Sequence, residues 1–170
     1  MGAQANGDLC QTVAFAREVA ARGYHVATFD WGSDYTSAMA SATRVLQSAG
    51  AQRIVVGGFS RGAVVGLGAA PRLGPRVVGV LSISGGPSAS EGYPTIASVS
   101  AYRGPLLLVA ARDDLVFPRG TSQRIAAHHT GDESVLLVPG SDHALALLDG
   151  DQASVVRRAI FGFLARVTAP

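Results

Sequence analysis

The sequence has no lysine, one cysteine and one tryptophan among its 170 residues. Because Cys10 is alone, the chain forms neither an internal disulfide nor a cysteine-rich metal site. We expect Cys10 to be a small buried residue on the first helix. All 14 basic residues are arginines, and only Arg157 and Arg158 are adjacent. A basic stripe with interleaved aromatic residues is therefore missing, which excludes nucleic acid as an expected partner.

Long apolar runs are missing as well. No stretch approaches the ~18 apolar residues of a membrane-spanning helix, and the chain does not open with the basic and apolar leader of a signal peptide. We therefore expect a cytoplasmic protein with no membrane span. The 48% of hydrophobic residues suits a compact core, and we expect residues 1–170 to form a single domain.

The most informative stretch runs from Arg53 to Val65 and reads as a buried strand, a tight turn and a helix. The turn carries Gly58-x-Ser60-x-Gly62, the pattern of a nucleophile elbow. Such a turn strains the backbone of its central serine, and glycines on both sides remove side chains that would collide. The plainer interpretation is that Ser60 only caps the following helix.

Further helices and strands follow from hydrophobic periodicity and from turn residues. We expect helices over 8–22, from Asp34 or Thr36 to 48, over 94–101, 121–129 and 151–167. We expect strands over 24–29, 53–57, 76–84, 105–111 and 134–139. Near-continuous Val, Ile and Leu in strands separated by helices predicts an α/β fold, with a doubly wound, mostly parallel sheet of about five strands.

A nucleophilic serine needs a base, and the base needs a group that holds its tautomer. Functional residues of a doubly wound sheet gather at the carboxyl ends of its strands. Asp113 and Asp114 follow one predicted strand, and His143 follows the next. The chain order Ser60, Asp114, His143 is the order expected for this type of elbow. Of the two acids, Asp113 stays open as an alternative.

The other histidines fit this role less well. His25 lies inside a predicted strand, whereas His128 and His129 end a predicted helix, where we expect them to be exposed. No matching carboxylate cluster accompanies them, so no metal site is predicted.

At these residues the chain resembles the α/β-hydrolase family of serine esterases and lipases. The segment Asp114-Leu115-Val116-Phe117-Pro118 is similar to the Asp-x-Val-x-Pro segment of the family, which favours Asp114 as the acid. The segment 2–7 looks like the family's loop after its third strand. The resemblance implies an oxyanion hole made by the backbone N–H groups of Arg61 and Ala3, with Gln4 as the runner-up for Ala3. It also implies that no metal or organic cofactor is required.

The sequence departs from the family at its start, because the family's first three strands should precede Gly2. We expect Tyr24–Phe29 to pair directly with 53–57, or a second copy to cover the free sheet edge in a homodimer. The segment 85–104 is too short for an inserted lid. An open site follows, with Phe59, Trp31 and Phe117 as apolar walls of the substrate pocket.

The sequence thus predicts a serine hydrolase of carboxylic esters with short, loosely selected acyl groups. Two alternatives stay open. The first is a non-catalytic or weakly active truncated module of the same fold. The second is a thioesterase or acyltransferase that uses the same triad.

Overall fold

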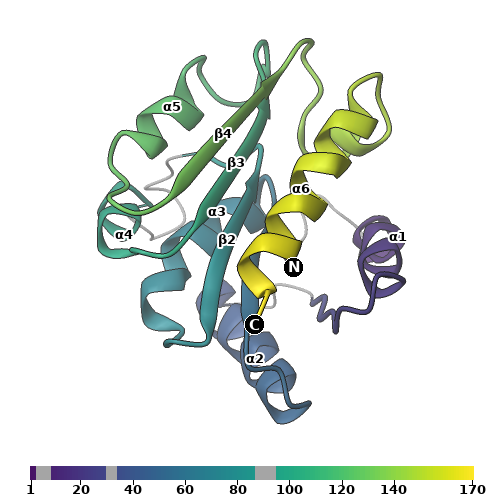
Figure 1. Ribbon diagram of the computed structural model, residues 1–170. Helices are drawn as coiled ribbons and strands as arrows, with labels where there is room; N and C mark the ends of the chain where they lie inside the picture. The colour runs from purple at the N-terminus through teal and green to yellow at the C-terminus, as the bar shows by residue number, and fades with distance from the viewer. Residues whose placement is uncertain (3–8, 30–33, 87–94) are drawn as a thin grey trace.

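The centre of the molecule is a sheet of four parallel strands in the order β1-β2-β3-β4 (Figure 1). The computed structural model describes residues 1–2, 9–29, 34–86 and 95–170. The strands are β1 (Ile54–Phe59), β2 (Val77–Ile83), β3 (Leu106–Ala111) and β4 (Glu133–Val138). Four of the five predicted strands, and the α/β class with a parallel sheet, are confirmed.

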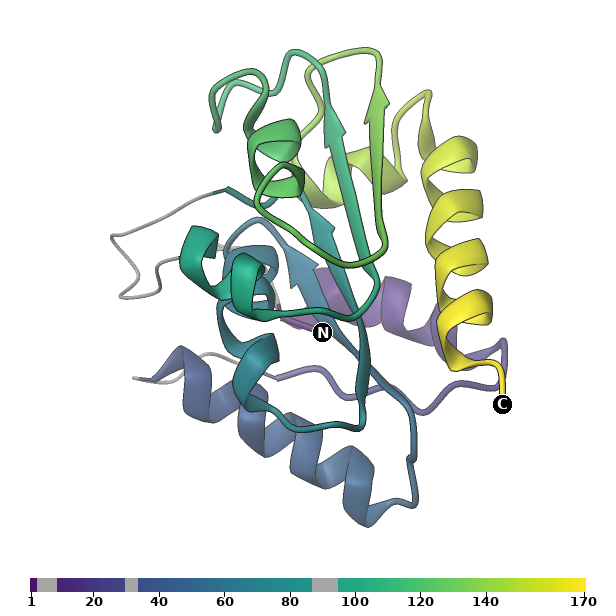
Figure 2. The ribbon, with the colours of Figure 1, turned by 60° about the vertical axis from the view of Figure 1, so that its left-hand side comes forward.

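Helices cover both faces of this sheet (Figure 2). One face carries α1 (Leu9–Ala20) and α6 (Ala153–Thr168), and the other carries α2 (Tyr35–Ser48), α3 (Arg61–Ala69), α4 (Thr95–Ala101) and α5 (Thr121–Ala126). The described residues also form two short 3-10 helices, η1 (Ala70–Arg72) and η2 (Ala144–Leu148).

Strand β3 shows why apolar runs form this three-layer structure. Leu106 and Leu108 pack into the cluster under α2 to α5, whereas Leu107 and Val109 pack into the cluster under α1 and α6. All four are at most 4% exposed. Because each fully buried side chain of this size stabilises the fold by roughly 1.5–3 kcal/mol, a strand covered on both faces is apolar at every position.

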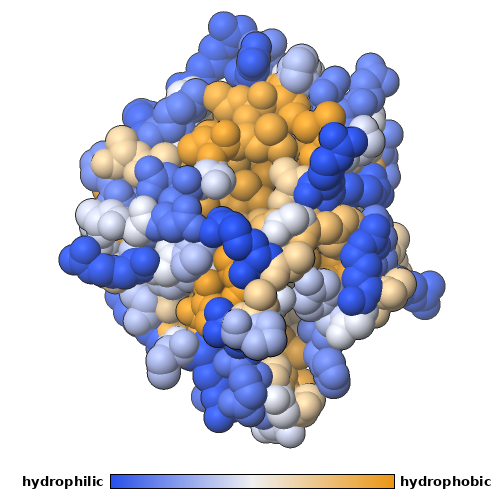
Figure 3. Space-filling view, in the orientation of Figure 1, coloured by the Kyte–Doolittle hydropathy of each residue, from blue (hydrophilic) through white to orange (hydrophobic). Residues whose placement is uncertain are grey.

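Strand β4 lies at one edge of the sheet and is less covered than the others. Val135 is 37% exposed, and Leu136 and Leu137 are half-buried. Apolar atoms reach the surface beside α6, over the β3 and β4 side of the sheet (Figure 3). Strands β1 to β3 are mostly buried, so they are the better covered part of the sheet.

The predicted strand at Tyr24–Phe29 is wrong. The segment is not a strand, and only Phe29 forms a β-bridge, to Gly2. Gly2 also bridges Gly58 in parallel, with Gly2 N donating to Gly57 O at 2.9 Å and Phe59 N donating to Gly2 O at 3.2 Å. One residue of the chain's own start thus stands between the two segments, which excludes their direct pairing at this end.

Beyond Gly2 the space between 24–29 and β1 is a cavity of about 410 Å³. It is lined mainly by apolar side chains, among them those of Phe15, Val19, Val26, Val55 and Leu164. The terminal amine of Met1 donates to Ala27 O at 2.6 Å, and burial lowers the pKa of this amine from 8.0 to about 5. A slot, rather than a fifth strand, separates the two segments.

Helix α2 begins as its sequence predicts. The carboxylate of Asp34 accepts hydrogen bonds from Thr36 N at 3.0 Å and Ser37 N at 3.2 Å, so it satisfies two of the free N–H groups of the first turn. The hydroxyl of Ser37 also donates to this carboxylate at 2.6 Å, and these bonds, the hydroxyl first, lower the pKa of Asp34.

Cys10 differs from its prediction, because it is exposed on α1 rather than buried. In the described ranges, no helix has both the length and the apolar composition needed to cross a bilayer.

Candidate active site

Ser60 occupies the turn between β1 and α3 in a strained conformation. Its φ of 49° and ψ of −112° lie in a region that non-glycine residues rarely adopt. Ser60 is at the N-cap position of α3, yet its side chain makes no capping hydrogen bond to the described residues of this helix. The interpretation of Ser60 as a simple helix cap is therefore wrong, and its half-buried hydroxyl stays available for other contacts.

Close backbone packing explains the glycine before this turn. A Cβ atom on Gly58 would lie 2.1 Å from the carbonyl oxygen of Gly2. On the other side of the strand, Ser60 N donates to Ile83 O at 2.8 Å. The turn is thus held between the start of the chain and the end of β2.

Asp114 and His143 come together from the ends of β3 and β4. The Nδ1 atom of His143 lies 2.7 Å from Oδ2 of Asp114. The other carboxylate oxygen of Asp114, Oδ1, accepts Val116 N at 2.9 Å. The Asp114 side chain is 7% exposed and that of His143 is 23% exposed. The carboxylate is held on both oxygens, and the imidazole keeps its second nitrogen, Nε2, for other contacts.

Asp113 is oriented differently. Its carboxylate forms an ion pair with Arg119 on the surface, where 49% of the Asp113 side chain is exposed. Of the two adjacent acids, Asp114 is the one that contacts the imidazole.

Ser84, directly after β2, connects the end of this strand to the loop that carries His143. Its buried Oγ accepts the backbone N–H of Ala144 at 2.9 Å, and Ala144 is the residue after His143. Ser60, Ser84 and Ala144, with φ of 49°, 50° and 55°, are the three non-glycine residues of positive φ in the described part of the chain. Backbone strain is therefore concentrated where Ser60 and His143 are placed.

Sequence reasoning missed Ser84. The signal that could have found it is its position: Ser84 follows a buried strand and precedes Gly85-Gly86, at the same sheet edge as Ser60.

Of the three residues predicted as pocket walls, one lines a cavity, one is buried in the core and one lies outside the described residues. Phe117 lies beside His143, with ring centroids 6.0 Å apart, and lines a cavity of about 500 Å³ together with Asp114 and Ser84. Phe59 is fully buried and packs edge-on against Phe15 at 5.8 Å, so it is a core residue rather than a wall. Trp31 lies outside the described residues.

Of the two predicted oxyanion donors, Arg61 is described by the structure and Ala3 is not. Arg61 is the first residue of α3, so its backbone N–H belongs to the turn that carries the Ser60 hydroxyl. Its guanidinium contacts Tyr35, with Nη1 donating to the phenol oxygen at 3.1 Å. Ala3 and its runner-up Gln4 lie outside the described residues.

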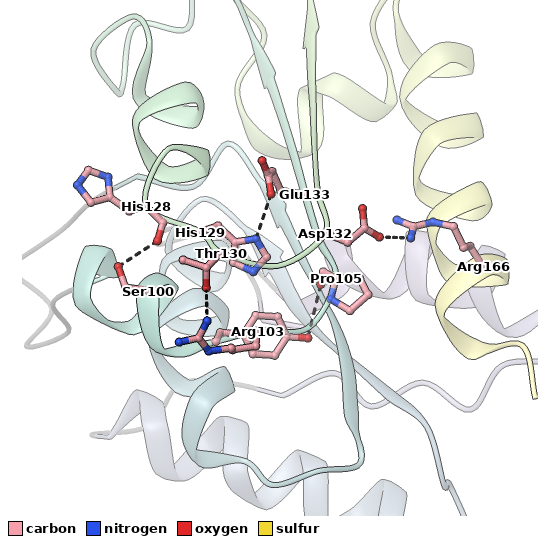
Figure 4. Close-up of polar contacts among 10 residues, drawn as sticks. Ser100, Arg103, Pro105, His128, His129, Thr130, Asp132, Glu133 and Arg166 are labelled. Atoms are coloured by element: carbon pink, nitrogen blue, oxygen red, sulfur yellow. Dashed lines mark hydrogen bonds and ion pairs between the residues drawn. The ribbon is translucent and has the colours of Figure 1, made fainter.

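The paired histidines follow α5 and lie near the amino end of β4, at the opposite end of the strands from this site (Figure 4). His128 is exposed, as predicted. The prediction for His129 is wrong, because its side chain is fully buried, stacks on Tyr102 at 6.0 Å and lies 3.5 Å from Glu133 Oε2. Burial also raises the pKa of Tyr102 to about 12. His129 is thus part of the core packing between α4 and α5.

Solved structures share this fold over almost the whole chain. The esterase domain of a Rhodothermus marinus protein is 19% identical with a TM-score of 0.82, over 99% of this chain and 86% of that one. A structure described with the metagenome-derived lipolytic enzymes LipS and LipT is 18% identical with a TM-score of 0.77, over 94% and 90%. A lipase-esterase related protein from Clostridium acetobutylicum is 16% identical with a TM-score of 0.75, over 95% and 91%.

The sequence itself matches one family model. No curated protein matches the chain. The model of the phospholipase/carboxylesterase family matches residues 39–142, which is more than half of the chain and includes Ser60, Ser84 and Asp114. This match agrees with the α/β-hydrolase fold and with the esterases and lipases that share it. The chain therefore belongs to the phospholipase/carboxylesterase family of the α/β hydrolases.

Proposed function

We propose that this protein hydrolyses carboxylic esters through Ser60, His143 and Asp114. The observation that carries the proposal is the contact of 2.7 Å between His143 Nδ1 and Asp114 Oδ2, at the sheet edge where Ser60 occupies a strained turn. An aspartate at this nitrogen fixes the tautomer in which Nε2 accepts a proton.

In the first half of the reaction, Ser60 Oγ attacks the carbonyl carbon of the ester while His143 Nε2 takes the hydroxyl proton. The carbonyl oxygen becomes an oxyanion, and we assign the Arg61 backbone N–H as one of its donors. The second donor is assigned to Ala3 by resemblance alone. The tetrahedral intermediate collapses, the alcohol leaves with the proton from His143, and the acyl group stays on Ser60.

In the second half, His143 takes a proton from water as the water attacks the acyl carbon. The carboxylic acid is released and Ser60 Oγ regains its proton. Asp114 stabilises the imidazolium that forms in both halves. The segment 84–105, which separates β2 from β3, is too short to contain an inserted lid domain. This supports short, loosely selected acyl groups as substrates.

The test is the variant Ser60→Ala, assayed with p-nitrophenyl acetate and butyrate. We expect kcat to fall by a factor on the order of 10⁶ while the circular dichroism spectrum stays unchanged. The matched control is Ser134→Ala, which removes an exposed hydroxyl from β4 and should leave turnover unchanged.

A fluorophosphonate should add one phosphonyl group to the native protein and none to Ser60→Ala. Full turnover in Ser60→Ala would refute the assignment. A native protein that reacts with neither substrate nor probe would support the non-catalytic alternative.

A further inference from the structure

We infer that Ser84 is a positioning residue that sets where His143 stands relative to Ser60. The inference rests on the proposed function of these two residues. It concerns a side chain that does not reach the reacting atoms itself and acts through the backbone of the histidine loop.

The hydrogen bond from Ala144 N to Ser84 Oγ is deeply buried. Ser84 is 1% exposed and Ala144 is 0% exposed, and the bond is 2.9 Å long. Because both residues are buried, the loss of the Ser84 hydroxyl removes the acceptor of the Ala144 N–H in a place where a hydrogen bond is costly to lose. Ser84 thus anchors the backbone of the histidine loop directly after His143, whereas Asp113 N anchors it earlier by donating to Gly140 O at 3.0 Å.

Both partners of this hydrogen bond have a strained backbone, which indicates that the surrounding contacts fix their positions. Ser84 has a φ of 50°, and Ala144 a φ of 55°. Each costs of order 1–3 kcal/mol in a non-glycine residue and persists only where surrounding contacts impose it. The contacts at Ser84 are clear: its N–H donates to Val109 O at 2.7 Å while its Oγ holds Ala144. A glycine at position 84 would relieve the strain but would lack the acceptor.

Two adjacent residues connect Ser60 to His143. Ile83 O accepts Ser60 N, and Ser84 Oγ accepts Ala144 N. Asp114 holds only the imidazole ring, through Nδ1. With the ring pinned at one nitrogen, a shift of the backbone would turn the ring about Nδ1 and change the position of Nε2 relative to Ser60. Ser84 supplies the second fixed point.

The decisive variant is Ser84→Gly. We expect kcat to fall about 10–100-fold, the range for a misplacement of catalytic groups by about 1 Å. KM should change by less than about twofold, because Ser84 is 1% exposed and offers almost no surface to an acyl group. The melting temperature should stay close to that of the native protein, since relief of strain offsets the lost hydrogen bond.

A second variant, Ser84→Cys, keeps the size and the strain but offers sulfur, a weaker acceptor. We expect its kcat to lie between those of the native protein and Ser84→Gly, and it keeps the test valid if the glycine variant does not fold. The matched control is Ser82→Ala. Ser82 is equally buried on β2, but its hydroxyl has no partner among the described residues, so kcat should stay unchanged.

The outcomes separate the two proposals. If Ser84→Gly, or Ser84→Cys when only that variant folds, keeps native kcat while Ser60→Ala is inactive, the positioning role is wrong and the proposed function stands. If Ser82→Ala loses as much kcat as the Ser84 variants, general packing explains the loss and the positioning role is also wrong. Activity in Ser60→Ala would overturn the proposed function itself.

Discussion

Gly66 of α3 lies directly against Gly57 of β1: a Cβ atom on Gly66 would be 2.7 Å from the Gly57 Cα atom. Gly57 itself has a φ of 150°, and a Cβ there would be 1.8 Å from Leu81 O. The helix that follows Ser60 can approach β1 this closely only because Gly66 lacks a side chain, and β1 can pass Leu81 of β2 only because Gly57 lacks one. The position of the Ser60 turn therefore depends on residues that carry no functional group.

This contact predicts opposite effects for two glycine-to-alanine substitutions in helices. Gly66→Ala should lower the free energy of unfolding by about 1–3 kcal/mol, because the backbone of β1 must move. Gly162→Ala, in α6, has nothing within 4 Å of the new methyl group, so it should raise the free energy by about 0.5–1 kcal/mol. Urea unfolding measures both. Equal effects would contradict the close approach of α3 to β1.

The two adjacent acids should differ sharply in turnover. Asp114→Asn should lower kcat on the order of 10⁴-fold, because an amide at Nδ1 favours the wrong tautomer of His143. Asp113→Asn should lower it less than about threefold, because that carboxylate pairs with Arg119 at the surface. Steady-state kinetics with p-nitrophenyl acetate measures both variants. The reverse ranking would move the role to Asp113.

The terminal amine of Met1 should make stability depend on pH. Its pKa is about 5 in the folded chain and 8.0 when unfolded, so between these values only the unfolded state binds the proton. The free energy of unfolding should therefore fall as pH drops from 8 to 5, by at most about 1.4 kcal/mol per unit from this group.

The absence of lysine gives this prediction a clean control, since the chain contains one amine that an acylating reagent can modify. Urea unfolding at pH 5.5 and 8.5 should show a smaller difference after acetylation of Met1, because an amide does not titrate. The same pH slope before and after acetylation would rule out the buried amine as its source.

A methyl group at position 58 should release the start of the chain. In Gly58→Ala the new Cβ would collide with Gly2 O, 2.1 Å away, so Gly2 should leave its place between Phe29 and Gly58. The rate of acetylation of the Met1 amine should then rise at least tenfold at pH 7. The control Gly162→Ala should react at the native rate, and an unchanged rate in Gly58→Ala would contradict the contact.

Local patterns predicted most of the fold, and the failures have physical causes. Asp34 as a cap and the four strands of the sheet depend on residues close in sequence. The segment Tyr24–Phe29 has the pattern of a strand, but a strand exists only with a neighbour, and Gly2 supplies just one bridge. Whether a neighbour is present is a tertiary property that periodicity does not contain.

In the site, too, local patterns predicted some residues, whereas residues that depend on tertiary contacts were missed. Ser60, Asp114 and His143 were predicted because strand ends meet at one sheet edge and because motif spacing marks them. The structure brings His143 and Asp114 into contact, and the catalytic roles of the three residues stay a prediction. Ser84 was missed because its role depends on a backbone N–H, which leaves no trace in residue type. The burial of His129 depends on the stacking of Tyr102, which lies on a different segment.

The strand order β1-β2-β3-β4 follows the order of the chain, and this has a consequence for folding kinetics. Each ladder closes over one helical connection, so the loop entropy lost at each step is modest. The bridge from Gly2 to Gly58 is different, because it closes across about the first third of the chain and needs β1 in place beforehand. We therefore expect refolding to complete the sheet first and to dock the start of the chain last. Esterase activity should return more slowly than the far-ultraviolet circular dichroism signal, because the Ser60 turn becomes rigid only when Gly2 has arrived.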